Sequence, residues 1–252
     1  MEPAEYEMMA AVEDRHWWYS GMRAIYAAWL DATFPGRSDL DILDAGCGTG
    51  GNGDFLRRYG RPVGLDLARE ALVLGQRRLP GRILGGSVVE LPFAASTFDL
   101  VTSFDVLYHR AVIDERAALR ETWRVLKPGG SLLIRLPAYR WLSGKHDRAV
   151  HTRHRYTARE VRQALANTNF AVERLSYVNS VLFPVPLIQR TMERIVPWLE
   201  RPGSDLTPPG RLTNTLLRSV LESEAAWLRR GGTFAWGLSV LCLARKPVVS
   251  SQ

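Results

Sequence analysis

Residues 42–51 of the chain form the stretch Ile42-Leu43-Asp44-Ala45-Gly46-Cys47-Gly48-Thr49-Gly50-Gly51. A short apolar run leads into four glycines, and the residues that follow favour a helix. Glycine is needed where a backbone turns sharply or where a ligand approaches too closely for a Cβ atom. Open α/β sheets bind their ligands in such loops, at the carboxyl ends of strands. The stretch therefore predicts an α/β fold with a ligand site at the tip of its first strand.

Short apolar segments alternate with helical patterns on either side of this stretch. The expected strands are residues 40–45, 62–66, 82–86, 98–104, 131–136, 170–177 and 233–244. The expected helices are residues 8–33, 54–59, 69–78, 114–126, 157–166, 187–199 and 212–229. This alternation predicts a mostly parallel, seven-stranded sheet with helices on both faces.

The glycine loop is compatible with two kinds of cofactor. Gly46, Gly48 and Gly51 satisfy the G-x-G-x-x-G pattern of dinucleotide-binding proteins, so an NAD-dependent oxidoreductase is one alternative. Two details favour S-adenosylmethionine (SAM) instead. Asp44 directly precedes the loop, where a carboxylate suits the cationic amino and sulfonium groups of SAM but repels a pyrophosphate. In addition, Gly46, Gly48 and Gly50 have G-x-G-x-G spacing.

Residues 43–50 resemble motif I of the class I SAM-dependent methyltransferases, and three further stretches resemble other motifs of that family. These stretches are Gly64-Leu65-Asp66, Leu91-Pro92-Phe93 with Phe98-Asp99-Leu100-Val101, and Arg124-Val125-Leu126-Lys127-Pro128-Gly129-Gly130. Their order and spacing also fit, and Asp66 lies 22 residues after Asp44. The chain is therefore similar to the bacterial small-molecule branch, of type 11 and quinone-biosynthesis-like. The resemblance implies an enzyme with a Rossmann-like sheet, an antiparallel seventh strand and SAM as cofactor.

The resemblance also implies specific cofactor contacts. The glycines would pass close to the methionine moiety, Asp66 would hold the ribose hydroxyls, and Leu67 would pack on adenine. Ser87 departs from the family pattern, which often has an aspartate at the adenine edge. The full set of expected cofactor residues is Trp18, Arg23, Asp44, Gly46, Gly48, Gly50, Asp66, Leu67, Ser87, Val88, Phe104 and Asp105.

Two stretches outside the core resemble the same bacterial branch. His16-Trp17-Trp18-Tyr19 followed by Arg23 resembles its N-terminal helix, which implies a Trp18 wall and an Arg23 pair with the SAM carboxylate. The polar, aromatic loop at residues 138–156 is expected over the open edge of the sheet. His109 and His146 are the preferred proton acceptors, because histidine titrates near neutral pH. A base helps only with a hydroxyl acceptor, so O-, N- and C-methylation all remain open.

The chain is expected to form one domain, residues 1–252. A helical cover (1–38) precedes a SAM-binding core (39–180 and 231–248), which residues 181–230 interrupt. The apolar insertion predicts a substrate cap or a homodimer surface, and extra core packing is the alternative. A cap favours an apolar or bulky acceptor such as a natural product, a quinone or a lipid-type compound. A cyclase or partner subunit that binds SAM without methyl transfer is another alternative.

The composition of the chain argues against nucleic acid and metal ions as binding partners. The net charge of +7 comes mainly from arginines that are interleaved with acidic residues, which argues against nucleic acid binding. Phe104-Asp105-Val106-Leu107 stands where nucleic acid methyltransferases carry an N/D-P-P-Y tetrapeptide. The two cysteines, Cys47 and Cys242, lie far apart and predict no metal site. Without a signal-peptide pattern or an apolar stretch of ~18 residues, the expected compartment is the cytoplasm.

Overall fold

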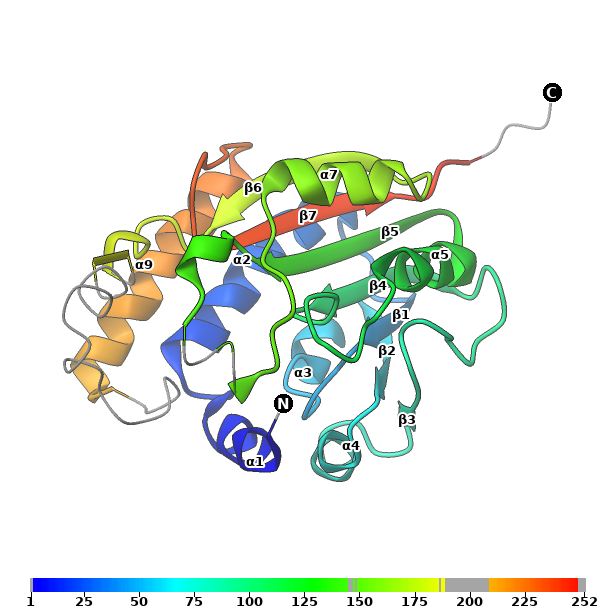
Figure 1. The fold of residues 1–252 in the computed structure, drawn as a ribbon, viewed down its shortest axis with the longest axis horizontal. Helices are drawn as coiled ribbons and strands as arrows, with labels where there is room; N and C mark the ends of the chain where they lie inside the picture. Colours follow the sequence, from blue (N-terminus) through cyan, green and yellow to red (C-terminus); the bar gives the residue numbers. More distant parts are fainter. Residues whose placement is uncertain (1, 145–146, 148, 186, 189–208, 249–252) are drawn as a thin grey trace.

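The computed structural model describes residues 2–144, 147, 149–185, 187–188 and 209–248. Seven strands form one sheet in the order β3-β2-β1-β4-β5-β7-β6 (Figure 1). Their bounds are Leu40–Ala45 (β1), Gly60–Asp66 (β2), Ile83–Gly85 (β3), Phe98–Phe104 (β4), Leu126–Pro137 (β5), Ala171–Val178 (β6) and Ser239–Arg245 (β7). Strand β7 is antiparallel to β5 and β6, and the other pairs are parallel. The predicted Rossmann-like sheet is confirmed.

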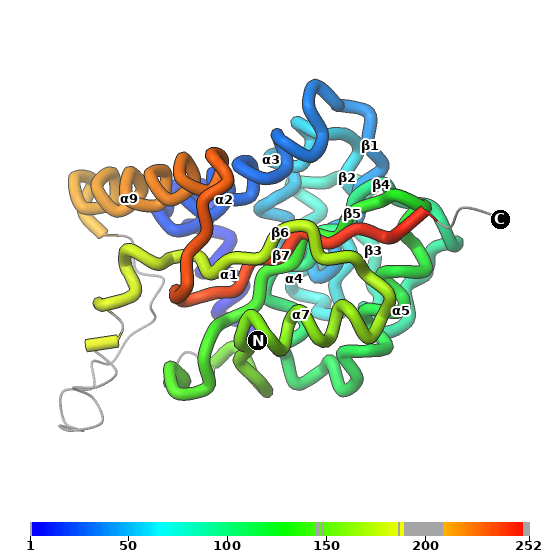
Figure 2. Tube along the Cα trace, turned by 90° about the horizontal axis from the view of Figure 1, so that it is seen from above, coloured from blue at the N-terminus to red at the C-terminus, as the bar shows by residue number. Residues whose placement is uncertain are grey.

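Helices cover both faces of the sheet (Figure 2). Their bounds are Pro3–Val12 (α1), Trp17–Thr33 (α2), Gly53–Leu56 (α3), Arg69–Gly75 (α4), Glu115–Val125 (α5), Ala158–Ala166 (α7) and Arg211–Arg229 (α9). One apolar cluster joins α2, α3 and α9 to the sheet, and another joins α5 and α7 to its opposite face. Adjacent residues of one strand, such as Ile42 and Leu43, enter opposite clusters, as expected for a sheet buried on both sides.

Several of the sequence-derived boundaries are wrong, among them the start of β5, which lies at Leu126 and not at residue 131. The single helix expected at residues 8–33 is two helices, because the chain turns at residues 13–16 and His16 caps α2. The Nδ1 atom of His16 accepts a hydrogen bond from the Trp18 amide at 3.3 Å. Strand β7 begins at Ser239, later than the expected residue 233. Most of the helix expected at residues 187–199 lies outside the described residues.

Helix α9 comes from the insertion at residues 181–230 and packs along α2. Its second half buries Leu221, Ala225 and Leu228 in the apolar cluster that also contains the core of α2. The buried carboxylate of Glu224 accepts a hydrogen bond from the Val181 amide at 2.8 Å, which ties the end of β6 to this helix. This half of α9 therefore belongs to the core. Within the described residues, no helix combines the length and apolar character needed to cross a membrane.

The contact between α2 and α9 predicts a steric effect at Gly21. A Cβ atom there would lie 2.5 Å from the Cβ of Leu221, too close to its backbone for the side chain to rotate away. Gly21→Ala should therefore destabilise the protein, because overpacking of about 1–3 kcal/mol exceeds the helix-propensity gain of about 0.5–1 kcal/mol. Thermal unfolding should show a lower Tm. Gly210→Ala is the control, since no atom lies within 4 Å of its Cβ position. Equal Tm values for both variants would contradict this packing.

Candidate functional site

The glycine loop follows β1 and requires glycine for its backbone conformation. Gly46, Gly48 and Gly50 have φ angles of 84°, 53° and 76°, in the left-handed region that side chains rarely tolerate. The amides of Gly46 and Cys47 donate to the Leu65 carbonyl at 2.7 and 3.0 Å, which fixes the loop against β2. The loop is thus fixed against β2, and Gly46 and Gly48 are partly exposed whereas Gly50 and Gly51 are buried.

Asp44 lies buried at the end of β1, directly beneath this loop. Its Oδ1 accepts a hydrogen bond from the Thr102 hydroxyl of β4 at 2.8 Å. Within the described part of the chain its Oδ2 has no hydrogen-bond partner, although it is buried. Burial raises the pKa of the Asp44 carboxyl to about 7, and the nearby charge of Asp66 adds to this effect. A cation beside Oδ2 would stabilise the ionised form.

Asp66 ends β2 and is held by the backbone on both sides. Its Oδ2 accepts from the Gly48 amide at 2.8 Å and its Oδ1 from the Ala68 amide at 3.0 Å. Burial raises its pKa, and these amide donors act in the opposite direction. The next residue, Leu67, is 62% exposed. Asp66 therefore has a fixed orientation, with lone pairs left over for further donors.

Glu13, at the end of α1, lies over the glycine loop, a contact that the sequence analysis did not identify although it expected a helical cover at residues 1–38. Glu13 is buried, and its Oε1 accepts from the Thr49 hydroxyl at 2.5 Å and pairs with Arg78 at 3.3 Å. A Cβ atom at Gly51 would collide with the Glu13 Oε2 atom, at 1.9 Å. Burial raises the Glu13 pKa. Gly51 is thus small because a side chain from the N-terminal segment occupies the space beside it.

Arg23, on α2, points into the same region. Its Nη2 donates to the Glu13 carbonyl, and its buried Nε has no partner among the described residues. Burial lowers the Arg23 pKa, while the Glu13 charge opposes this shift. A buried donor without an acceptor is costly, at about 1–3 kcal/mol. The site therefore contains one unpartnered cationic donor and one unpartnered carboxylate oxygen.

A second charged pair lies at the carboxyl ends of β4 and β5. Arg135 is buried and pairs with Asp105 through two nitrogens, one of them Nε at 3.2 Å from Oδ1. The guanidinium lies 4.5 Å from the centre of the Trp18 ring. Asp105 has a φ of 58°, so its backbone is strained where β4 ends. Sequence reasoning selected Trp18 and Asp105 but missed Arg135, because an arginine inside a strand carries no motif.

The remaining cofactor candidates are packed rather than open. Phe104 stacks on Tyr26 with ring centres 4.0 Å apart. Val88 is buried, and the Ser87 hydroxyl accepts a hydrogen bond from the Val89 amide at 3.3 Å. Phe104 thus presents one face to Tyr26, and Ser87 has already used an acceptor lone pair within its own turn. These contacts do not assign the residues to a cofactor, so their role stays a prediction.

The two predicted proton acceptors cannot be compared, since His146 lies outside the described residues. His109 is half-buried, and burial lowers its pKa to about 4. Its Nδ1 accepts from the Ala111 amide at 3.1 Å, so the neutral ring carries its proton on Nε2. In this tautomer Nε2 is a donor. The role of His109 as a base stays a prediction, and it requires a different tautomer from the one that this contact selects.

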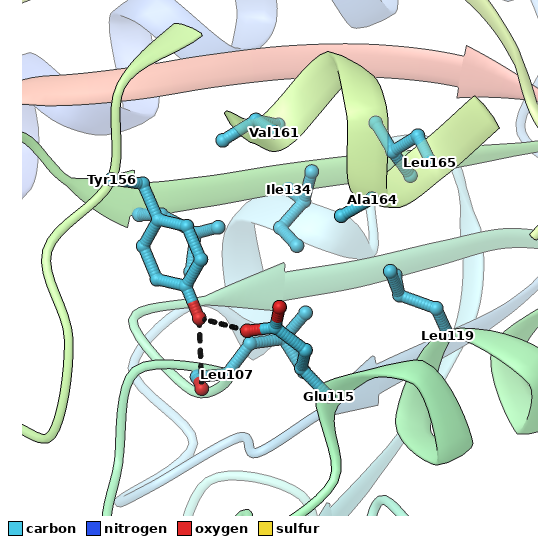
Figure 3. Close-up of a pocket in the computed structure, with 9 residues that line it drawn as sticks. Leu107, Glu115, Leu119, Ile134, Tyr156, Val161, Ala164 and Leu165 are labelled. Atoms are coloured by element: carbon cyan, nitrogen blue, oxygen red, sulfur yellow. Dashed lines mark hydrogen bonds between the residues drawn. The ribbon is translucent and has the colours of Figure 1, made fainter. Parts of the chain in front are cut away.

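The loop that follows β5 is anchored across the sheet edge. Figure 3 shows the Tyr156 hydroxyl directed at Glu115 and Leu107 beside a small apolar cavity. The hydroxyl lies 2.6 Å from the Glu115 carboxylate and donates there or to the Leu107 carbonyl at 3.3 Å. Arg155 also pairs with Asp147, at 2.8 Å. The predicted overhanging loop is therefore fixed at its end to α5. In the described part of the chain, no three His, Cys, Asp or Glu side chains are grouped to bind a metal.

Comparisons with known proteins agree with this geometry. A family model described as "Methyltransferase domain" matches residues 43–134. The malonyl-[acyl-carrier protein] O-methyltransferase of Enterobacter lignolyticus is 31% identical over 217 residues, 81% of this chain and 80% of that protein. A probable S-adenosylmethionine-dependent methyltransferase of Mycolicibacterium smegmatis is 31% identical over 165 residues, 64% of this chain. That match spans 62% of the relative's length, less than two thirds of it.

A solved structure shows the same fold. Geranyl diphosphate C-methyltransferase from Streptomyces coelicolor, in complex with Mg²⁺, geranyl diphosphate and S-adenosyl-L-homocysteine, superposes with a TM-score of 0.55. The match covers 88% of this chain and 80% of that one, at 19% sequence identity. At this identity the likeness concerns the fold alone.

The contacts of Glu13 predict that this residue limits the local opening of helix α1 from the glycine loop. Glu13→Ala leaves the Thr49 hydroxyl and Arg78 without this buried partner, a loss of about 1–3 kcal/mol. Local opening of α1 should rise roughly five- to hundredfold, since 1.4 kcal/mol is tenfold. Hydrogen–deuterium exchange of residues 3–12 measures this. Glu7→Ala, an exposed glutamate on the same helix, is the control and should change exchange little. Unchanged protection in Glu13→Ala would show that the Glu13 contacts with Thr49 and Arg78 do not hold α1 on the glycine loop.

Proposed function

Because the chain belongs to the class I SAM-dependent methyltransferases, we propose that it methylates a small molecule of apolar or bulky character, such as a quinone, a natural product or a lipid-type compound. SAM is the cofactor of this family. The observation that carries the proposal is the pair of unpartnered, oppositely charged atoms beside the glycine loop, Asp44 Oδ2 and Arg23 Nε.

These two atoms fit the methionine end of SAM. That end carries an ammonium and a carboxylate on one carbon, so it needs an anion and a cation that face a common space. Asp44 supplies the first and Arg23 the second, from β1 and α2. The left-handed glycines carry no side chains of their own, and the Val106 and Met9 side chains pack close to Gly46 and Gly48. A dinucleotide pyrophosphate would instead face the buried Asp44 carboxylate, which disfavours the NAD-dependent alternative.

Asp66 and Leu67 would bind the ribose and adenine end of the cofactor. The Gly48 and Ala68 amides orient the Asp66 carboxylate, whose remaining lone pairs would accept from the two ribose hydroxyls. The exposed Leu67 side chain follows directly and would cover one face of adenine. With Trp18, Ser87, Val88, Phe104 and Asp105, these residues remain our proposed cofactor contacts.

The chemistry places modest demands on the protein. SAM supplies a methyl group on a cationic sulfur that becomes neutral when the group leaves, so no strong acid is needed. The residues of this chain must hold an acceptor in line at ~3 Å and exclude water. Because His109 presents a donor rather than a base in this structure, acceptors that react without deprotonation fit best. We favour a carbon or nitrogen nucleophile over a hydroxyl.

The walls beside the site favour an apolar acceptor. Trp18 and Tyr19 are partly buried aromatic residues of α2, and the buried Tyr26 stacks on Phe104 at the end of β4. Arg135, which is buried beside Trp18 and Tyr26, is already neutralised by Asp105. An aromatic enclosure with a compensated charge suits a flat or hydrocarbon compound better than a free anion.

A SAM-binding protein without transferase activity, such as a cyclase or partner subunit, is the second candidate. The cofactor contacts proposed above are the same in both cases, so only turnover distinguishes them. Incubation with SAM and a panel of quinones, phenols and lipid-type amines, followed by detection of S-adenosylhomocysteine, tests transfer. Product formed with any member supports the methyltransferase, whereas tight SAM binding without product across the panel supports the second candidate.

The ribose contact predicts a large effect at Asp66. Asp66→Ala removes two charge-assisted hydrogen bonds and should weaken SAM at least thirtyfold, which corresponds to roughly 2–4 kcal/mol. Isothermal titration measures this affinity. Asp39→Ala, an exposed aspartate at the other end of β1, is the control and should bind SAM as the parent does. A near-parental affinity in Asp66→Ala would remove the assignment.

The pKa of Asp44 predicts a pH dependence of SAM affinity. Its carboxyl, with a pKa raised from 3.8 to about 7, attracts the cofactor's ammonium only when ionised. The ionised fraction rises about eightfold between pH 6 and 7.5 for a pKa near 7, and affinity should rise with it. Asp44→Asn should bind more weakly and lose this slope. A slope that persists in Asp44→Asn would assign the titration to another group.

A further inference from the structure

Three segments expose apolar side chains at the same end of the molecule. Trp141 follows β5, Val181, Val185 and Ile188 follow β6, and Leu212 and Leu216 lie in the first half of α9. Their exposed fractions lie between 43% and 88%. The first half of α9, residues 211–220, contributes no buried residue at all. We call these six side chains the exposed apolar surface.

The three segments are connected to one another and to the core. The Phe183 ring lies 6.0 Å from both the Trp141 and the Tyr139 rings, which joins the segments after β5 and β6. The Val181 amide donates a hydrogen bond to the Glu224 carboxylate of α9. The Asn214 side chain accepts from the Trp17 amide at 2.9 Å, which fixes the first half of α9. Figures 1 and 2 both show the segment after β6 and the first half of α9 at the left-hand end of the molecule.

The charges within these segments have one sign. Residues 138–144, 179–188 and 209–221 contain Arg140, Arg211 and Arg218 and no aspartate or glutamate. All three arginines are exposed. Arg218 pairs with Glu222 at 2.7 Å on the adjoining turn, whereas neither Arg140 nor Arg211 forms an ion pair with another described residue. The surface is therefore apolar at its centre and basic around it.

We propose that the exposed apolar surface docks on an anionic lipid bilayer. Leucine, valine and tryptophan side chains insert at the boundary between headgroups and acyl chains, and arginines bind the phosphates beside them. The +7 net charge of the chain adds long-range attraction to an anionic membrane. Because these three segments contain no acidic side chain, no carboxylate repels the lipid phosphates at the point of contact.

A second copy of this chain is a less suitable occupant. In a twofold-symmetric dimer the same patch meets itself, so Arg140 and Arg211 would be brought near their own equivalents. Like charges at the rim of such an interface oppose association. An anionic lipid surface instead complements each arginine.

Docking would orient the reaction site. Trp141 and Val181 follow the carboxyl ends of β5 and β6, and this edge of the sheet also carries the glycine loop and Asp105. The edge would thus face the bilayer, and an acceptor dissolved in lipid could reach the site without crossing water. This consequence, unlike the docking itself, rests on the proposed function.

Vesicle sedimentation of the full chain tests the proposal. We expect binding to vesicles with 30% phosphatidylglycerol in phosphatidylcholine, weaker binding as salt is raised, and little binding to pure phosphatidylcholine. The double variant Leu212→Ser/Leu216→Ser should reduce the partition coefficient at least tenfold, and Arg211→Glu should reduce it severalfold. Val248→Ser is the matched control, because Val248 is 69% exposed but follows β7 at the other end of the sheet.

Three outcomes would overturn the docking. These are no sedimentation with anionic vesicles, equal sedimentation of the double-leucine variant and the parent, or equal loss in Val248→Ser. A dimer in solution that the leucine variants convert to monomer, without vesicle binding, would assign the surface to a second copy instead. SAM titration of the same variants keeps the two proposals separate. Parental SAM affinity with lost vesicle binding supports docking whatever the acceptor is.

Discussion

A buried carboxylate beneath a glycine turn is the constraint on which this structure depends. Asp44 is removed from water at the tip of β1 and is satisfied on one oxygen only, by Thr102 of the neighbouring strand. Burial raises the pKa of such a carboxyl group, and a cation beside it would lower that pKa again. The left-handed glycines that follow it let the backbone turn tightly, with Val106 and Met9 packed against Gly46 and Gly48. A cationic ligand beside the unpartnered Oδ2 atom would stabilise the ionised form of the Asp44 carboxylate.

The groups that complete this site come from segments far apart in the chain. Glu13 follows α1, Arg23 lies on α2, and Arg78 follows α4, yet all three converge around the glycine loop. Because Glu13 fills the space beside Gly51, helix α1 is part of the site rather than an appendage. The carboxylate and the two arginines offset one another, which makes their joint burial tolerable.

The opposite side of the site is built from strand ends. Asp105 and Tyr139 both have positive φ angles where β4 and β5 end, and strain of this kind persists only when the surroundings fix it. The Arg135 pair fixes Asp105, and ring stacking with Trp141 and Tyr177 fixes Tyr139. From there the surface becomes apolar toward α9. The proposed cofactor side is therefore charged, whereas the proposed acceptor side contains aromatic residues.

The sequence by itself determined the sheet, the glycine turn and the family, since short apolar runs, glycines and Asp66 act through local spacing. The bounds of β1 and β4 agree with the expected ones for this reason. Only the tertiary structure decided the break before α2, the placement of Glu13 over Gly51 and the burial of Arg135. A single glutamate or arginine carries no local signal, because its partner is chosen by the packing of distant segments. The sequence therefore predicted the glycine turn at which we propose the cofactor site, and folding decided which distant side chains lie beside that turn.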